Sequence, residues 1–157
     1  MREERNRAIA IARQALAPPR AGMAMPQPPY IVALRSVALL RASECVDQDQ
    51  VLELAKKIQT EGQWTQPIPI DGHSGLVMDG NHRLRVAHLL GLRRLPCIPL
   101  SYEDPRVQVR CWKTGQDFER QRLSELARRE LLLPFKTTRH SFSPCLPQSE
   151  IPLELLC

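Results

Sequence analysis

A carboxylate, an imidazole and a guanidinium fall close together near the middle of this chain. They are Asp79, His82 and Arg83, in the stretch Asp79-Gly80-Asn81-His82-Arg83. These groups offer a metal ligand or base, a proton donor or acceptor, and a two-pronged donor for phosphate. Together they are suited to holding an anion and moving a proton beside it. The structural alternative is that Asp79 only caps a helix and Arg83 covers its surface.

This stretch falls where a predicted strand turns into a predicted helix. Residues 76–78 are apolar, and the apolar residues after Arg83 have helical spacing as far as Gly91. The first turn of a helix aims unpaired backbone N–H groups outward at the positive end of the helix dipole. Gly80 lets a ligand approach the backbone closely. The sequence therefore predicts a site for anions, above all phosphates, at this turn.

A second group of hydrogen-bond donors follows Pro134, which ends a helix-forming stretch. It contains an ammonium, two hydroxyls, a guanidinium and an imidazole. Its members are Lys136, Thr137, Thr138, Arg139 and His140. A loop of this composition can close over an anion, and a solvated loop is the alternative.

The apolar patterning predicts one α+β domain with a small mixed sheet and helices packed on it. Asp47 is placed to cap a helix, with Gln50 completing a capping box, and the preceding Glu44 lies outside the apolar face of that helix. Trp112 ends an alternating strand, where a core position is the plain alternative. The predicted elements are a strand or bent pair of strands over 31–40, a helix from Asp47 to Gly62, a hairpin over 67–78, a helix over 81–90, strands over 95–100 and 107–112, and a helix over 114–132.

The two ends of the chain differ in composition from this domain. Residues 1–29 are basic and rich in proline, and we expect a poorly ordered arm there. The domain is expected over 30–142. Residues 143–157 contain three prolines and end in Leu153, Leu155 and Leu156, so this tail either straps onto the domain or frays.

Charge and cysteine content narrow the class of protein. The net charge is +5, but residues 1–29 carry five Arg against two Glu, which leaves 17 basic and 15 acidic residues elsewhere. A nucleic acid is therefore weakly indicated, and only through the arm. Five cysteines without a C-x-x-C pair favour neither a disulfide framework nor a zinc site, and suit a reducing cytoplasm. No apolar run is long enough to predict a membrane span.

The order of these features resembles the ParB/sulfiredoxin superfamily over roughly residues 34–140. The resemblance is carried by the Glu before a helix, the hairpin, D-G-N-H-R, G-L-R-R-L-P, the strand ending in Trp, and K-T-T-R-H. The last motif is the narrower one, and it makes the chain most similar to the free serine kinases, which convert L-serine to O-phospho-L-serine. Sulfiredoxins have a catalytic cysteine where this chain has Asn81, and partition proteins resemble G-E-R-R there. In the serine kinase branch the loop resembles D-G-H-H-R, so Asn81 replaces a histidine.

The resemblance implies a role for each matching residue. Glu44 matches the catalytic glutamate, which accepts the hydroxyl proton of serine, and Asp79 would orient the substrate or magnesium. Catalytic roles are thus implied for Glu44, Asp79 and His82. The implied phosphate-binding residues are Gly80, Asn81, His82 and Arg83. The implied serine-binding residues are Trp112, Lys136, Thr137, Thr138, Arg139 and His140. ATP or ADP would be the donor, with magnesium bound chiefly to the nucleotide.

The function expected from these observations is nucleotide-dependent phosphorylation of free L-serine or a similar small hydroxy amino acid. A nucleotide-binding regulatory module is the alternative from another class, with the basic arm serving a nucleic acid or protein partner. A domain with neither activity is the third possibility, because Asn81 departs from the motif.

Overall fold

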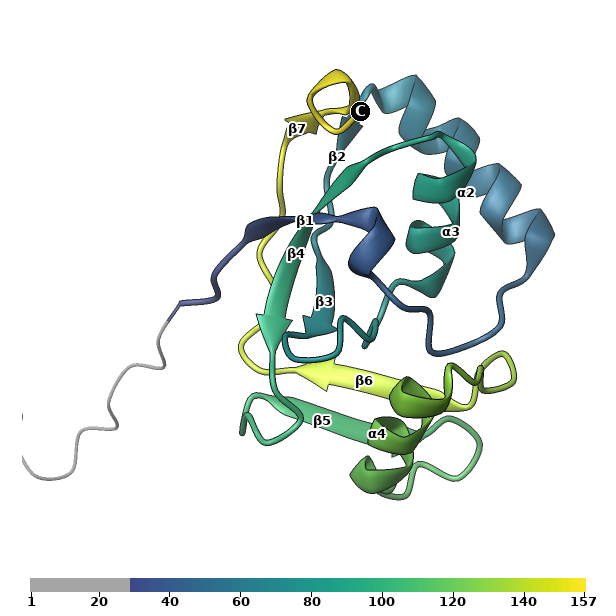
Figure 1. Cartoon of the computed structure of the whole chain (residues 1–157), viewed down its shortest axis with the longest axis vertical. Coiled ribbons are helices and arrows are strands. Elements are labelled where there is room, and N and C mark those ends of the chain that lie inside the picture. Colours follow the sequence, from purple (N-terminus) through teal and green to yellow (C-terminus); the bar gives the residue numbers. More distant parts are fainter. Residues whose placement is uncertain (1–28) are drawn as a thin grey trace, which may run out of the picture.

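The computed structural model describes residues 29–157, so the predicted arm of residues 1–29 lies outside the described residues except for Pro29. A three-stranded sheet is at the centre of the fold (Figure 1), with the order β1 (Ala33–Ser36), β4 (Arg94–Leu100), β3 (Ile68–Asp71). Strand β1 runs antiparallel to β4, and β3 runs parallel to it. The predicted α+β class with a small mixed sheet is confirmed.

Strand β4 is apolar from Leu95 to Leu100 because both of its faces are covered there. Leu95 and Cys97 pack into one hydrophobic cluster, whereas Ile98 and Leu100 pack into another. Successive side chains of a strand point to opposite faces, so the central sheet separates two cores. This explains why the sequence of β4 is a continuous apolar run and does not alternate.

The first core lies between the sheet and helices α2 (Gln48–Glu61) and α3 (Asn81–Leu89), which pack side by side (Figure 1). Asp47 caps α2 by accepting hydrogen bonds from the N–H groups of Asp49 and Gln50, at 2.9 and 3.1 Å. Gly62 ends the helix at φ 70°. The predicted bounds of α2 are confirmed. The predicted capping box is wrong, because the Asp47 N–H donates to His82 Nε2 at 3.2 Å.

The second core lies under β5 (Val107–Cys111), β6 (Thr138–Phe142) and α4 (Arg120–Arg129). Strands β5 and β6 form an antiparallel pair. Leu123 of α4 is fully buried against this pair and against β4. This smaller layer lies at the end of the sheet where β4 finishes (Figure 1), so it faces the turn that leads into α3.

Four local predictions are corrected. Residues Val37–Leu39 form a 3-10 helix, η1, where a strand was expected. The helix predicted over 114–132 covers only Arg120–Arg129, because Asp117 and Phe118 instead pair with β5. The loop predicted over 135–140 becomes strand β6 from Thr138. In the predicted hairpin the returning residues form isolated bridges, such as Ile70 to Val77, without a continuous strand.

The last residues of the chain pack onto the first core. Strand β7 (Ile151–Pro152) pairs with β2 (Gln63–Trp64), and the 3-10 helix η2 (Leu153–Leu155) follows it. Leu156 is fully buried, and its carbonyl accepts hydrogen bonds from the N–H groups of Arg93 and Arg94. The tail was expected either to pack onto the domain or to fray, and in the structure it packs onto the domain.

The substitution Leu156→Ala is expected to lower the free energy of unfolding by about 2 to 5 kcal/mol, because it removes a buried side chain and leaves a cavity. Leu155→Ala is the matched control, since Leu155 is 57% exposed. Urea denaturation of the two variants measures the difference. Equal stability of the two variants would contradict the packing of this strap.

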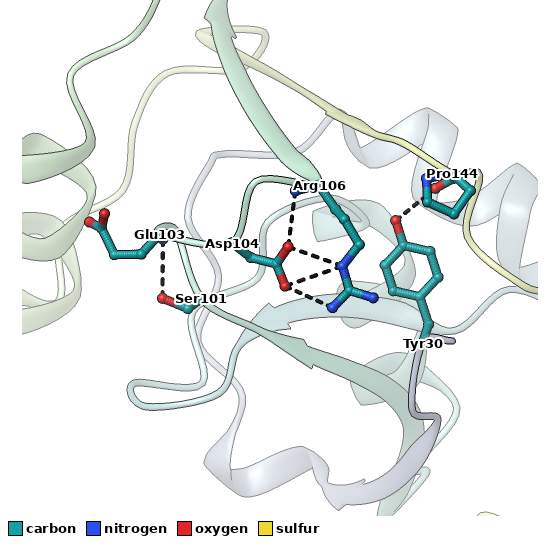
Figure 2. A network of polar contacts seen from close by, with 6 residues as sticks. All are labelled: Tyr30, Ser101, Glu103, Asp104, Arg106 and Pro144. Carbon is teal, nitrogen blue, oxygen red and sulfur yellow. Dashed lines mark hydrogen bonds and ion pairs between the residues drawn. The ribbon is translucent and has the colours of Figure 1, made fainter. Parts of the chain in front are cut away.

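A polar network joins the start of the described chain to the segment after β6 (Figure 2). The Tyr30 hydroxyl donates to the Pro144 carbonyl at 2.7 Å, and Arg106 lies 4.5 Å from the centre of the Tyr30 ring. Arg106 also forms an ion pair with Asp104 at 2.7 Å, and this hydrogen bonding lowers the pKa of Asp104.

Among residues 29–157, no helix combines the length and apolarity needed to cross a membrane.

Candidate active site

A cavity of about 490 Å³ opens at the N-terminus of α3. Three segments form most of its wall: the residues before α2, the turn into α3, and the segment from Phe135 to His140. The predicted site residues that line it are Glu44, Asp79, Gly80, Asn81, His82, Arg83, Trp112, Lys136, Thr138, Arg139 and His140. Thr137 is the predicted residue that is not part of the wall. Its hydroxyl donates to the Pro134 carbonyl at 2.6 Å.

Glu44 is held by strand β6 from across the cavity. Its Oε1 accepts one hydrogen bond from the Thr138 N–H at 2.7 Å and another from the Thr138 hydroxyl at 2.5 Å. No group within residues 29–157 is bonded to the other carboxylate oxygen, Oε2. A half-buried carboxylate with one fixed and one available oxygen is suited to accepting a proton from a bound hydroxyl.

The turn into α3 presents backbone donors, as predicted. Gly80 is the N-cap at φ 109°, and the first helical hydrogen bond runs from the Leu84 N–H to the Gly80 carbonyl at 2.9 Å. The N–H groups of Asn81, His82 and Arg83 precede that bond, so they belong to the helix end that attracts anions. Asp79 does not cap the helix, and its side chain is 61% exposed at the rim.

Arg83 lies under this turn and makes structural contacts. Its Nη1 donates to the carbonyls of Gln66 and Pro67 at 3.0 and 3.1 Å, and its side chain is 15% exposed. Burial lowers the pKa of the guanidinium. A Cβ on Gly80 would lie 3.0 Å from Arg83 Nη2. Glycine therefore lets the buried cation approach the backbone that would face an anion.

His82 has one nitrogen committed to the fold. Its Nε2 accepts the hydrogen bond from the Asp47 N–H, so the hydrogen of the neutral ring is on Nδ1. The ring meets Phe135 edge-on, with centroids 5.5 Å apart. In this tautomer His82 can offer an N–H to a phosphate oxygen.

Two cationic side chains lie close to Trp112 in the cavity wall. Lys136 Nζ and Arg139 Cζ each lie 5.5 Å from the centre of the Trp112 ring, which is 46% exposed. His140 differs from these two groups, because burial lowers its pKa to about 4 and leaves it neutral near pH 7. The Tyr102 hydroxyl lies 3.2 Å from His140 Nε2. The positive charge near Trp112 therefore comes from Lys136 and Arg139.

Stability is expected to fall as the pH drops from 7 toward 4, in part because of His140. The unfolded chain binds a proton there near pH 6.5, whereas the folded protein binds it near pH 4. The unfolded state therefore gains protons first, and folding weakens through that window. In urea unfolding, the free energy of unfolding is expected to fall less between pH 7 and pH 5 for His140→Gln than for the wild type. Equal losses would contradict the buried neutral imidazole.

Sequence reasoning missed several contacts of this site. The Thr138 to Glu44 pair joins residues 94 positions apart, and the Asp47 to His82 pair joins residues 35 apart. No local pattern encodes such pairs. Phe135 and Cys45 also line the cavity. Their positions next to predicted site residues in the sequence could have identified them.

Among the described residues, no group of three or more His, Cys, Asp or Glu side chains could hold a metal ion.

The fold agrees with comparisons to known proteins, although no family model matches the chain. The solved free serine kinase in complex with AMP superposes with a TM-score of 0.74 at 14% identity, over 87% of this chain and 98% of that chain. A variant of that kinase in complex with ADP superposes with the same TM-score. The chain has the ParB/sulfiredoxin-like α+β fold of the free serine kinases.

Sequence similarity points to the serine kinase branch within this fold. The ATP-dependent L-serine kinase of Desulfurococcus mucosus is 36% identical over 81 residues, which are 49% of this chain and 31% of that protein. The ATP-dependent L-serine kinase of Staphylothermus marinus is 38% identical over 64 residues, 38% of this chain and 25% of that protein. A ParB-like protein of Sulfolobus acidocaldarius is 39% identical over 46 residues, 29% of this chain and 23% of that protein. These matches confirm the predicted resemblance, and they span less than a third of each relative.

Proposed function

We propose that this chain is an ATP-dependent kinase that phosphorylates free L-serine to O-phospho-L-serine. The observation that carries the proposal is the single cavity that joins Glu44, the N-terminus of α3 and the cationic rim of Lys136 and Arg139. A base, a phosphate site and a carboxylate site are the three parts that this reaction needs. The similarity to ATP-dependent L-serine kinases supports the choice of substrate and donor.

In the proposed reaction, the serine hydroxyl oxygen bonds to the γ-phosphorus of ATP. The bond between that phosphorus and the oxygen bridging to the β-phosphate breaks, ADP leaves, and the hydroxyl proton passes to Glu44 Oε2. The N–H groups of residues 81–83 and His82 Nδ1–H would hold phosphate oxygens. Little covalent chemistry is asked of the protein, because phosphoryl transfer depends mostly on positioning and charge stabilisation.

Magnesium fits this site only in company with phosphate. Asp79 is the exposed carboxylate at the rim that would share the ion with the nucleotide, since Mg²⁺ is commonly bound by one or two carboxylates plus phosphate oxygens. When bound, the ion would neutralise charge on the phosphates.

Lys136 and Arg139 would bind the carboxylate of serine, with the nearby Trp112 ring as an apolar support. Arg can grip a carboxylate through two N–H groups, and Lys adds a point charge. Neutral His140 remains available as a hydrogen-bonding wall. The carboxylate would thereby be fixed at one side of the cavity while the hydroxyl reaches Glu44.

Phosphorus NMR tests this function directly. Purified protein is incubated with magnesium and ATP, or with magnesium and ADP, each with and without L-serine. A phosphoserine resonance that requires ATP and L-serine is expected, with a loss in His82→Ala and none in His88→Ala. His88 is an exposed residue of the same helix outside the cavity. Intact nucleotide under both donors would refute the kinase proposal.

The match to a ParB-like protein favours one rival, a nucleotide-binding regulatory module without phosphoryl transfer. For that rival, calorimetry would show nucleotide binding without turnover. Salt-sensitive DNA binding that disappears when residues 1–29 are deleted would further support it.

A further inference from the structure

We infer that Asn81 is a positioning residue that holds the backbone of Glu44, and that its side chain is not a phosphate ligand. The inference rests on the proposed function, in which Glu44 is the base. It concerns a position at which this chain departs from the motif that it resembles. The observations that carry it are the hydrogen bonds of one carboxamide.

The carbonyl oxygen of Asn81 is turned toward the segment before α2. Oδ1 accepts hydrogen bonds from the Ser43 N–H at 2.8 Å and from the Glu44 N–H at 3.3 Å. Two consecutive backbone donors thus converge on one side-chain oxygen. This occupies the acceptor of Asn81 and fixes the peptide plane from which the Glu44 side chain projects.

The amide nitrogen of Asn81 completes a closed network. Nδ2 donates to Ser43 Oγ at 3.1 Å, and that hydroxyl donates to the Val77 carbonyl at 2.7 Å. Ser43 is only 1% exposed, so these bonds exchange little with water. An unsatisfied donor or acceptor in such a place is destabilising. The network therefore ties Ser43, which precedes Glu44, both to Asn81 of α3 and to Val77 in the segment before α3.

Other contacts hold the same segment from the opposite side. The Leu133 N–H donates to the Ser43 carbonyl at 2.9 Å, and the Cys45 N–H donates to the Leu133 carbonyl at 2.8 Å. Thr138 fixes the carboxylate of Glu44 through Oε1. Asn81 controls the backbone and Thr138 controls the side chain, so together they decide where Oε2 lies relative to the helix N-terminus.

The two roles predict different losses in Asn81→Ala. A positioning role predicts that kcat falls by about 10²-fold, as for a small misplacement of a reacting group, while the nucleotide Kd is unchanged. A phosphate contact predicts a weaker nucleotide Kd. In the Glu44→Gln background the same substitution is expected to have no further effect on kcat, because it acts through Glu44. Arg85→Ala, an exposed residue of α3 outside the cavity, is the matched control.

Hydrogen exchange followed by NMR provides a readout that does not depend on activity. The amides of Ser43 and Glu44 are expected to lose protection in Asn81→Ala, while the amide of Cys45, which is bonded to Leu133, keeps it. If the wild type forms no phosphoserine, the kinase proposal fails. The exchange protection of the Ser43 and Glu44 amides still tests whether Asn81 holds this backbone segment. Unchanged protection, or a raised nucleotide Kd with unchanged kcat, would overturn the inference. If Asn81→Ala does not fold, Ser43→Ala provides the test. It is expected to lower kcat and the protection of these amides while the nucleotide Kd is unchanged. Wild-type values of kcat and amide protection in Ser43→Ala would overturn the inference.

Discussion

Glu44→Gln is expected to lower the rate of phosphoserine formation by about 10²- to 10⁴-fold, the range for removal of a general base. Glutamine keeps the size of the side chain and an oxygen that can accept both Thr138 hydrogen bonds. What it loses is the carboxylate oxygen that would take the serine proton. The variant should therefore fold and bind nucleotide as the wild type does, with the loss in kcat alone.

Rapid-quench kinetics with radiolabelled ATP and L-serine would measure this loss, and calorimetry would measure nucleotide binding. Glu53→Gln is the matched control, because Glu53 is an exposed glutamate of α2 outside the cavity wall. Wild-type kcat in Glu44→Gln would remove Glu44 from the mechanism. A raised nucleotide Kd with unchanged kcat would reassign it to binding.

Gly75→Ala is expected to lower the free energy of unfolding by at least about 4 kcal/mol, a size reserved for severe local conflicts. A Cβ at this position would lie 2.2 Å from the Leu39 carbonyl oxygen, and φ is +76°. The backbone cannot retreat easily, because the Gly75 N–H is bonded to the Asp71 carbonyl and the Gly75 carbonyl accepts the Arg41 N–H. The segment that continues to Glu44 would be displaced as well.

Gly91→Ala separates the steric conflict from the cost of the backbone angle. Gly91 has φ +67°, but a Cβ at this position would have nothing within 4 Å. Only the cost of the left-handed conformation remains, about 1 to 3 kcal/mol. The free energies of unfolding of the two variants, measured by chemical denaturation, should therefore differ by about 1 kcal/mol or more. Equal stabilities would show that the turn at residues 71–75 is not packed against Leu39.

Local signals were enough to predict the parts of the fold that surround the proposed phosphate site. Asp47 and Gly62 bound α2 because a side-chain cap and a left-handed glycine are encoded within one turn of each end. Gly80 and the helical spacing after it likewise encoded the turn into α3. Most predicted site residues share one cavity because the motif order of the resemblance carries the topology.

The remaining features depend on contacts between distant segments. Thr138 looked like part of a polar loop, yet pairing with Cys111 makes it a strand residue whose hydroxyl holds Glu44. Asp117 looked helical by composition, but its bridge to Arg110 keeps it out of α4. A polar residue in a short strand gives no sign of its partner, so these choices are made by tertiary structure.

A crystal structure with a non-hydrolysable ATP analogue, magnesium and L-serine tests the central claim most directly. We expect the phosphate chain against the N–H groups of residues 81–83 and the serine carboxylate between Lys136 and Arg139. The serine hydroxyl should lie within about 3.5 Å of the γ-phosphorus, as in a near-attack geometry, and in hydrogen-bond reach of Glu44 Oε2. A nucleotide bound outside this cavity, or a serine whose hydroxyl points away from Glu44, would contradict the proposed mechanism.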